Sequence, residues 1–182
     1  MKPLPALAAM LLLTACAHAP RTPEGPAPRA LAPVSAVSPR SASQVIHAAF
    51  GDRAATLRTA LEVSASGIKL VGVTATGQRL FTVSYDGTTV SAERGAFAPA
   101  DIQPERVLAD MQLALWPLPA LRQALGDGYE VAEPFGGVRR LRRDGRLVAE
   151  VHYAGGDPWA GRLWLVSFEH GYSLTVDTSP AN

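Results

Sequence analysis

Apolar and polar residues alternate with a period of two along most of this chain, and this feature constrains its fold more than any other. The alternating runs lie at residues 55–63, 68–73, 79–85, 138–143, 147–153, 162–168 and 172–176. Asp86-Gly87 and Asp144-Gly145, which separate neighbouring runs, are typical of two-residue hairpin turns. Because successive side chains of a strand point to opposite faces of its sheet, the pattern predicts a succession of antiparallel hairpins.

A change of period interrupts the strands in the middle of the chain. Pro104 suits the first turn of a helix, and apolar residues follow it at helical spacing as far as Leu115. Trp116-Pro117 ends this helix, and a second short helix is expected to end at Gly126. Roughly four strands precede the helices, and five or six follow. We therefore expect a mainly β (α+β) fold, in which a long curved antiparallel sheet forms a half-open β-barrel and the helical insert covers its concave face.

The N-terminus carries the only cysteine of the 182-residue chain, Cys16. Lys2 precedes an Ala/Leu-rich stretch of roughly ten residues, which is too short to span a bilayer but suits a signal peptide. Leu13-Thr14-Ala15-Cys16 resembles a bacterial lipobox. We expect residues 1–15 to be a lipoprotein signal peptide and Cys16 to be the site of lipid attachment, a palmitate-type acyl modification. The alternative is an ordinary secretory signal that leaves an unmodified cysteine.

A proline-rich segment separates this cysteine from the alternating pattern. Residues 17–43 contain six prolines and no helical or strand period. We interpret residues 16–43 as a lipidated N-terminus and tether, and residues 44–182 as the folded domain. Ala17 stands where lipoproteins retained in the inner membrane often carry Asp. The expected location is therefore the cell outer membrane, with the domain lipid-anchored and facing the periplasm.

The charge balance and the histidines bear on the class of function. The chain has 17 Lys+Arg and 16 Asp+Glu, a net charge of +1, which argues against nucleic acid as a partner. None of the four histidines has the spacing of a metal motif, and no nucleophile elbow is present. We therefore expect no catalytic residue, no metal and no cofactor. An enzyme with a triad assembled from distant residues is the alternative.

Two sets of residues are candidates for binding. The first is a basic group across one predicted hairpin: Arg139, Arg140, Arg142, Arg143 and Arg146. It predicts either a membrane-facing patch for anionic headgroups or a charged hairpin that protects a sheet edge from aggregation. The second set consists of apolar residues expected on the inner face of the sheet and on the helix: Leu70, Phe81, Val83, Tyr85, Leu108, Met111, Leu115, Trp116, Val151, Tyr153, Leu163 and Leu165. These residues either fill a core or line an apolar cavity.

Four segments, in this order, carry a resemblance to a known family: GIKLVGVTATGQRLFTVSYDG, ERVLADMQLALWPLPALRQAL, VRRLRRDGRLVAEVHY and GYSLTVDT. Together they resemble an uncharacterised, domain-of-unknown-function family of bacterial lipoproteins that is often encoded beside aryl-polyene biosynthesis genes. That family is similar to the LolA/LolB lipoprotein-carrier fold. The resemblance covers about residues 45–178. It implies an outer-membrane lipoprotein that binds or helps to transfer a hydrophobic ligand of the acyl, lipid or polyene type. The alternative is a non-enzymatic assembly or scaffold factor that recruits another envelope protein.

Overall fold

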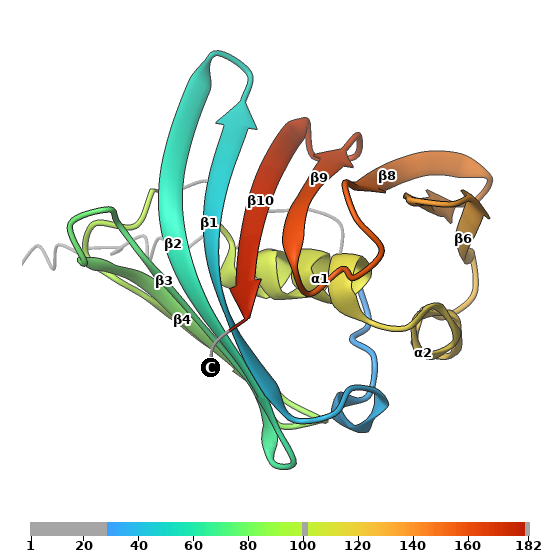
Figure 1. The fold of residues 1–182 in the computed structure, drawn as a ribbon, viewed down its shortest axis with the longest axis horizontal. Helices are drawn as coiled ribbons and strands as arrows, with labels where there is room; N and C mark the ends of the chain where they lie inside the picture. The colour runs from blue at the N-terminus through green and yellow to red at the C-terminus, as the bar shows by residue number, and fades with distance from the viewer. Residues whose placement is uncertain (1–28, 100–101, 181–182) are drawn as a thin grey trace, which may run out of the picture.

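The computed structural model describes residues 29–99 and 102–180 (Figure 1). Five strands are followed by two helices and then by five further strands. In chain order the elements are β1 (Arg40–Phe50), β2 (Arg53–Ser64), β3 (Gly67–Val73), β4 (Arg79–Tyr85), β5 (Val90–Arg94), α1 (Pro104–Leu115), α2 (Leu118–Ala124), β6 (Tyr129–Phe135), β7 (Val138–Arg143), β8 (Arg146–Tyr153), β9 (Gly161–Ser167) and β10 (Tyr172–Pro180). A 3-10 turn (Val34–Ala36) precedes β1.

All ten strands form one antiparallel sheet in the order β5-β4-β3-β2-β1-β10-β9-β8-β7-β6. Each half is a meander of neighbouring hairpins, and the two halves join where β1 pairs with β10. In this pair Ala42 lies opposite Pro180 and Phe50 lies opposite Tyr172. The outermost strands, β5 and β6, do not pair with each other, so the sheet is open. The expected half-open antiparallel sheet with a helical insert is confirmed.

The sharp hairpins form where the sequence places glycine. Asp144 and Gly145, which connect β7 to β8, have positive φ angles of 50° and 78°, as a turn that matches the twist of its strands requires. Gly67 opens β3 with a φ of 151°, and a Cβ atom there would lie 2.5 Å from the backbone oxygen of Tyr85. The close approach of the start of β3 to the end of β4 therefore depends on the absence of a side chain at residue 67.

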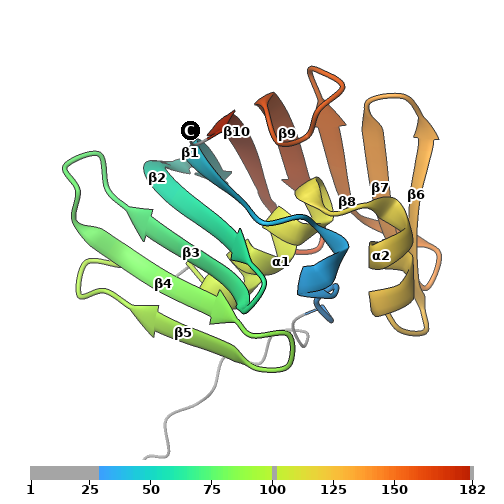
Figure 2. The same ribbon diagram turned by 60° about the horizontal axis from the view of Figure 1, so that its bottom comes forward.

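Helix α1 lies along the concave side of the sheet, and α2 lies beside β6 and β7 (Figure 2). Before entering β1, the chain passes across the side of α1 that faces away from the sheet. We call residues 29–37 the strap. Within it Ala32 and Val34 are buried in the hydrophobic core.

The folded domain therefore begins earlier than the expected boundary at Gln44. Strand β1 starts at Arg40, and the strap before it is packed against α1. The pattern of β1 explains the difference, because its buried positions are Ala42, Gln44, Ile46 and Ala48. Small and polar residues at three of these four positions give a weak apolar alternation.

Candidate functional site

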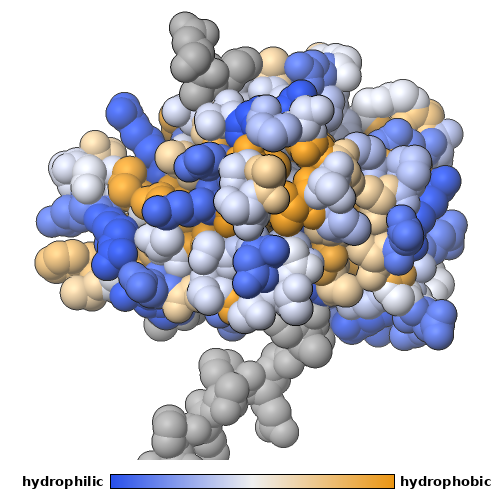
Figure 3. Space-filling model, turned by 90° about the horizontal axis from the view of Figure 1, so that it is seen from below, coloured by the Kyte–Doolittle hydropathy of each residue, from blue (hydrophilic) through white to orange (hydrophobic). Residues whose placement is uncertain are grey.

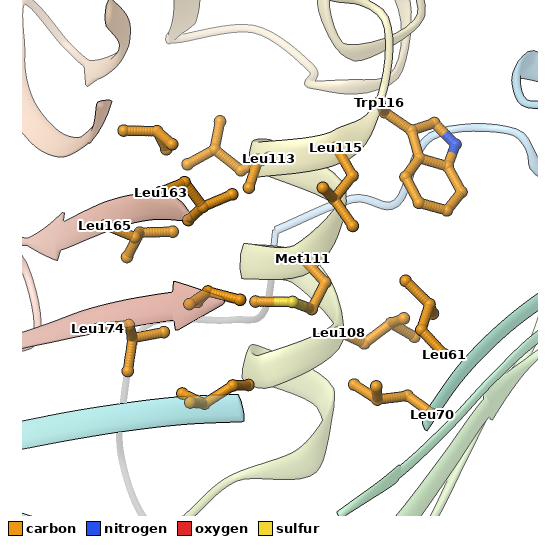
Figure 4. Close-up of a cluster of buried hydrophobic side chains, with 14 of the residues drawn as sticks. Leu61, Leu70, Leu108, Met111, Leu113, Leu115, Trp116, Leu163, Leu165 and Leu174 are labelled. Atoms are coloured by element: carbon orange, nitrogen blue, oxygen red, sulfur yellow. The ribbon is translucent and has the colours of Figure 1, made fainter. Parts of the chain in front are cut away.

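The twelve apolar residues singled out in the sequence all lie in or against one hydrophobic cluster between α1 and the sheet. Figure 4 shows how α1 divides it. Leu108 points towards Leu61 and Leu70 of the first half of the sheet, and Met111 points towards the strands of the second half. Ten of the twelve are 0–2% exposed: Leu70, Phe81, Val83, Leu108, Met111, Leu115, Trp116, Val151, Leu163 and Leu165. Tyr85 is 8% exposed and Tyr153 is partly buried against the cluster.

These ten residues form a packed core in this structure. A side chain that bordered an internal space of water size would present accessible surface to that space, and these side chains present almost none. The side chains of α1 thus occupy the concave side of the sheet that a ligand would otherwise fill. Any ligand between α1 and the sheet has to displace α1.

Helix α1 is enclosed on every side. All eight residues from Leu108 to Leu115 are buried, including the polar residues Asp110 and Gln112. A helix that packs on a sheet by one face normally exposes the opposite face. Here the strap covers that face. Figure 3, which views the molecule from below, shows hydrophobic residues gathered near the middle of this side within hydrophilic surroundings.

The strap is fastened to α1 by directional contacts. The backbone N–H of Ala32 donates to Oε1 of Gln112 at 2.6 Å, and Nε2 of Gln112 donates to the backbone oxygen of Ala32 at 3.1 Å. Nε1 of Trp116 donates to the backbone oxygen of Pro33 at 3.1 Å. The guanidinium of Arg29 forms an ion pair with Asp110. The contacts of the strap thus extend along α1 from Asp110 to Trp116, the residue that follows its last turn.

The C-terminal end of α1 is held by side chains from the second half of the sheet. Arg139 of β7 donates to the backbone oxygens of Leu113 at 2.6 Å and Trp116 at 2.8 Å. Tyr153 donates to the oxygen of Ala114 at 2.7 Å. Nε1 of Trp159 donates to the oxygen of Leu115 at 3.1 Å. These bonds satisfy the carbonyl groups that a helix end leaves without partners, and the positive guanidinium complements the negative end of the helix dipole.

This role of Arg139 corrects one expectation for the basic group. Arg139 is 5% exposed and is also paired with Glu133 at 2.7 Å, so it cannot face a membrane. Its burial follows from its place on β7, where its side chain points to the concave side and to α1. Burial also raises the pKa of the neighbouring Tyr153 to about 12, so its hydroxyl stays a donor at neutral pH.

The other four arginines lie nearer the surface. Arg140 pairs with Glu150 at 2.5 Å, and Arg143 pairs with Glu169. Arg142 donates to the backbone oxygen of Gly145 at 2.9 Å. Arg146 is exposed. Among the residues that the structure describes, Arg142 and Arg146 have no carboxylate partner.

Asp110 is the centre of a polar cluster that the sequence analysis did not identify. Its carboxylate is 2% exposed and accepts hydrogen bonds from Arg29 and from the hydroxyl of Tyr172. Burial, together with the negative charge of Asp110, raises the pKa of Tyr172. The ring of His170 stacks on Tyr172 with 6.2 Å between centroids. Burial lowers the pKa of His170, and the positive charge of Arg106 adds to this effect.

The sequence did contain a signal for the two buried polar residues of α1. Asp110 and Gln112 interrupt an apolar helix on the side away from the sheet, where an exposed polar face was the ordinary interpretation. Their burial depends on the strap. Within the described part of the chain, no group of three or more His, Cys, Asp or Glu side chains is placed to hold a metal ion. Cys16 lies outside the described residues.

The fold and this site together define the class of the domain: a single open antiparallel sheet whose concave side is filled by a two-helix insert. The family described as protein of unknown function (DUF3261) matches residues 41–180, and the chain belongs to this family. No curated protein sequence matches the chain. In the described residues, no helix has the length and apolar composition needed to cross a bilayer.

Several solved structures are similar to this chain, among them the following two. One is a LolA superfamily protein from Nitrosomonas europaea, with 14% sequence identity, a TM-score of 0.43, and coverage of 78% of this chain and 84% of that chain. The other is a DUF1329 family protein from Desulfovibrio piger, with 11% identity, a TM-score of 0.40, and coverage of 80% and 85%. The expected uncharacterised family is confirmed. The association with aryl-polyene genes stays a prediction.

Proposed function

We propose that this domain binds a hydrophobic molecule of the acyl, lipid or polyene type between α1 and the concave side of the sheet, and helps to transfer it in the periplasm. The observation that carries this proposal is the way α1 is attached. Towards the sheet it presents Leu108, Met111 and Leu115, which make apolar contacts without directional bonds. Among the residues that the structure describes, its hydrogen bonds to the rest of the domain go to the strap, to Tyr172 and to side chains at its C-terminal end.

This attachment suits a helix that moves as a unit. If the strap detaches, the N-terminal part of α1 can leave the sheet while Arg139, Tyr153 and Trp159 retain its C-terminal end. Movement of this kind exposes the apolar side chains of the sheet, which an alkyl or polyene chain can cover in place of Leu108 and Met111.

The free energies of apolar burial allow a ligand chain to replace Leu108 and Met111 against the sheet. Taking Leu108 and Met111 out of the core loses roughly 3–6 kcal/mol of apolar burial. Ten buried methylenes of a ligand contribute about 8 kcal/mol. A long chain therefore offsets the loss, whereas a short one does not. We therefore expect the domain to bind long apolar chains more tightly than short ones.

A conjugated polyene fatty acid, cis-parinaric acid, is a direct probe because its fluorescence rises in an apolar site. We expect saturable binding by the purified full chain, with weaker binding of shorter acyl chains in competition. Native mass spectrometry of protein purified from membranes should show a bound lipid. A protein that neither takes up the probe nor carries a lipid would contradict the proposal.

We further propose that Cys16 carries the acyl anchor and that the domain is held at the outer membrane. The lipobox-like sequence supports this, and Arg29, which is bonded to α1, lies only thirteen residues after Cys16. An anchored domain of this kind is restricted to the membrane surface, where a hydrophobic ligand is delivered or collected.

One observation favours the alternative of a scaffold factor. Phe135 and Trp164 are 54% and 40% exposed, which is unusual for large apolar side chains. If they bind another envelope protein, the F135S and W164S variants will lose a stoichiometric partner that wild-type protein retains on purification, with no lipid bound to either. That result would replace the carrier proposal with the scaffold one.

A further inference from the structure

The tip of the β7–β8 hairpin and the turn between β9 and β10 form a surface that the ligand site does not use. Between them lies a groove of about 430 Å³ lined by Arg143, Arg146, Leu147, Phe168 and Glu169, among others. Phe168 is 53% exposed beside this groove. We call Arg142, Arg146 and Phe168, together with the groove, the hairpin surface.

The charges around the hairpin surface nearly balance, but two of its arginines form no ion pair among the described residues. Arg143 and Glu169 neutralise each other. Arg142 and Arg146 form no ion pair among the described residues, although Asp144 lies at the turn between them and Glu130 lies opposite Arg142 on β6. An exposed aromatic ring beside unpaired arginines is the composition of a membrane-interface contact, where the ring enters the headgroup region and the guanidinium groups meet phosphates.

The position of the hairpin surface is the second observation. Arg29, the first residue described, is bonded to Asp110, which accepts a hydrogen bond from Tyr172. Tyr172 directly follows the turn that carries Phe168. The chain therefore enters the domain beside the hairpin surface.

The length of the preceding segment limits how the domain can face the membrane. Thirteen residues from Cys16 to Arg29 reach roughly 40 Å when fully extended as polyproline II. The eleven residues of β1 alone span about 36 Å. The far ends of the strands thus lie about 36 Å from the point where the chain enters the domain, which is nearly the full reach of the segment. The surface beside the point of entry therefore meets the membrane first.

We infer that the hairpin surface rests on a phospholipid surface containing anionic headgroups, with Phe168 at the interface and Arg142 and Arg146 facing phosphates. This inference rests on the proposed anchor at Cys16, and it does not depend on a ligand beneath α1. Of the five arginines that the sequence suggested as a membrane-facing patch, the inference retains Arg142 and Arg146, and it adds Phe168.

Tryptophan substitution tests the contact in the lipidated protein reconstituted into vesicles of phosphatidylethanolamine and phosphatidylglycerol with brominated acyl chains. Phe168 and Phe135 are nearly equally exposed, at 53% and 54%, so F135W is a matched control. The three native tryptophans are common to both variants. We expect bromine to quench the emission added by F168W and to leave that added by F135W unchanged. Equal quenching in both variants, or none in F168W, overturns the inference.

A charge test uses the full chain carrying Cys16→Ser, so that no acyl chain contributes to binding. Each arginine near an anionic surface contributes roughly a fivefold change in affinity. The R142Q/R146Q variant should therefore bind vesicles containing phosphatidylglycerol about 25-fold more weakly. The R58Q/K69Q variant, which removes two exposed charges from β2 and β3, should bind as before. A similar loss in both variants overturns the inference.

The outcomes also separate this inference from the proposed anchor and from a protein partner. If Cys16→Ser still incorporates labelled palmitate, the anchor proposal fails, while the vesicle assay still measures the hairpin surface. If Phe168→Ser abolishes capture of one stoichiometric envelope protein but leaves vesicle binding unchanged, the hairpin surface binds that protein and the membrane inference is wrong.

Discussion

The side-chain amide of Gln112 pairs with both backbone groups of Ala32, one as donor and one as acceptor, across 80 residues of sequence. This pairing satisfies an extended segment and a buried helix residue at the same time. It is the most specific contact between the strap and α1, and it ties the exposure of α1 to the position of the strap.

Replacing Gln112 with Ala should release the strap. The substitution leaves the N–H and C=O groups of Ala32 without protein partners, and we expect a loss of about 1–3 kcal/mol in the free energy of unfolding. Hydrogen exchange should accelerate in α1 before it does so in the central strands, and uptake of cis-parinaric acid should increase. Gln123→Ala, at an exposed position of α2, is the control. Uniform acceleration of exchange throughout the sheet would show that the strap does not act on α1.

Replacing Arg139 with Met should destabilise the domain far more than a surface substitution does. The helix carbonyls and Glu133 lose a common partner, and we expect a loss of about 2–4 kcal/mol. Arg139→Lys should restore only part of this, because one ammonium cannot reproduce the planar set of donors. Arg142→Ala should change the stability by less than about 0.5 kcal/mol. Chemical denaturation of the three variants checks the order, and equal losses for Arg139 and Arg142 would refute the structural role.

The stability of the domain should fall as the pH drops below about 6.5, in part through His170. Burial and the positive charges of Arg106 and Arg29 lower its pKa, and these effects outweigh Glu169 and Asp110, which raise it. Because the pKa in the folded state lies below the unfolded value of about 6.5, the unfolded chain binds the proton first. The contribution of His170 is therefore complete above that value and is lost as the pH falls through the folded-state pKa.

His170→Gln should flatten this part of the pH profile. His47→Gln is the control, because His47 is exposed and its ring hydrogen-bonds to Thr56 at the surface. The free energy of unfolding, measured by denaturant titration at several pH values, provides the comparison. A profile that His170→Gln leaves unchanged would assign the pH dependence to other groups.

Cys16→Ser should change where the protein is found. Without the thiol no acyl group can be attached, so incorporation of labelled palmitate should be lost, and the protein should move from the membrane fraction to the soluble periplasmic fraction. The stability of residues 29–180 should not change. Retention of label by the Cys16→Ser variant would place the modification elsewhere.

The alternating pattern predicted the hairpins because local turn chemistry and the apolar faces agree. Asp144-Gly145 forms the expected turn, and Leu57, Leu61 and Val63 share the buried face of β2. The same rule missed β1, whose inward residues are mainly small or polar. Buried Gln44 is tolerated there because it bonds to Thr59 and Thr178 on the two neighbouring strands, and partners so far apart in sequence are not visible to a local pattern.

The candidate site was predictable in composition but not in arrangement. The apolar residues of α1 and the sheet gather as the sequence indicated. Arg139 looked like its neighbours Arg140 and Arg142, and only the path of α1 across the sheet turns it into a buried partner of helix carbonyls. Likewise, proline in the strap indicated a tether, although Ala32 and Pro33 bond to α1.

The pairing of β1 with β10 has a consequence for how the chain reaches its native state. In this pair, residues 42–50 meet residues 172–180, so the central seam of the sheet cannot close until nearly the whole chain has been made. Until then β1 has an edge without a partner, which invites intermolecular pairing. The small and polar residues that weaken the apolar pattern of β1 also make its unpaired edge less prone to intermolecular association. A strand that is poor in apolar side chains is therefore suited to be the first strand formed and the last to be completed.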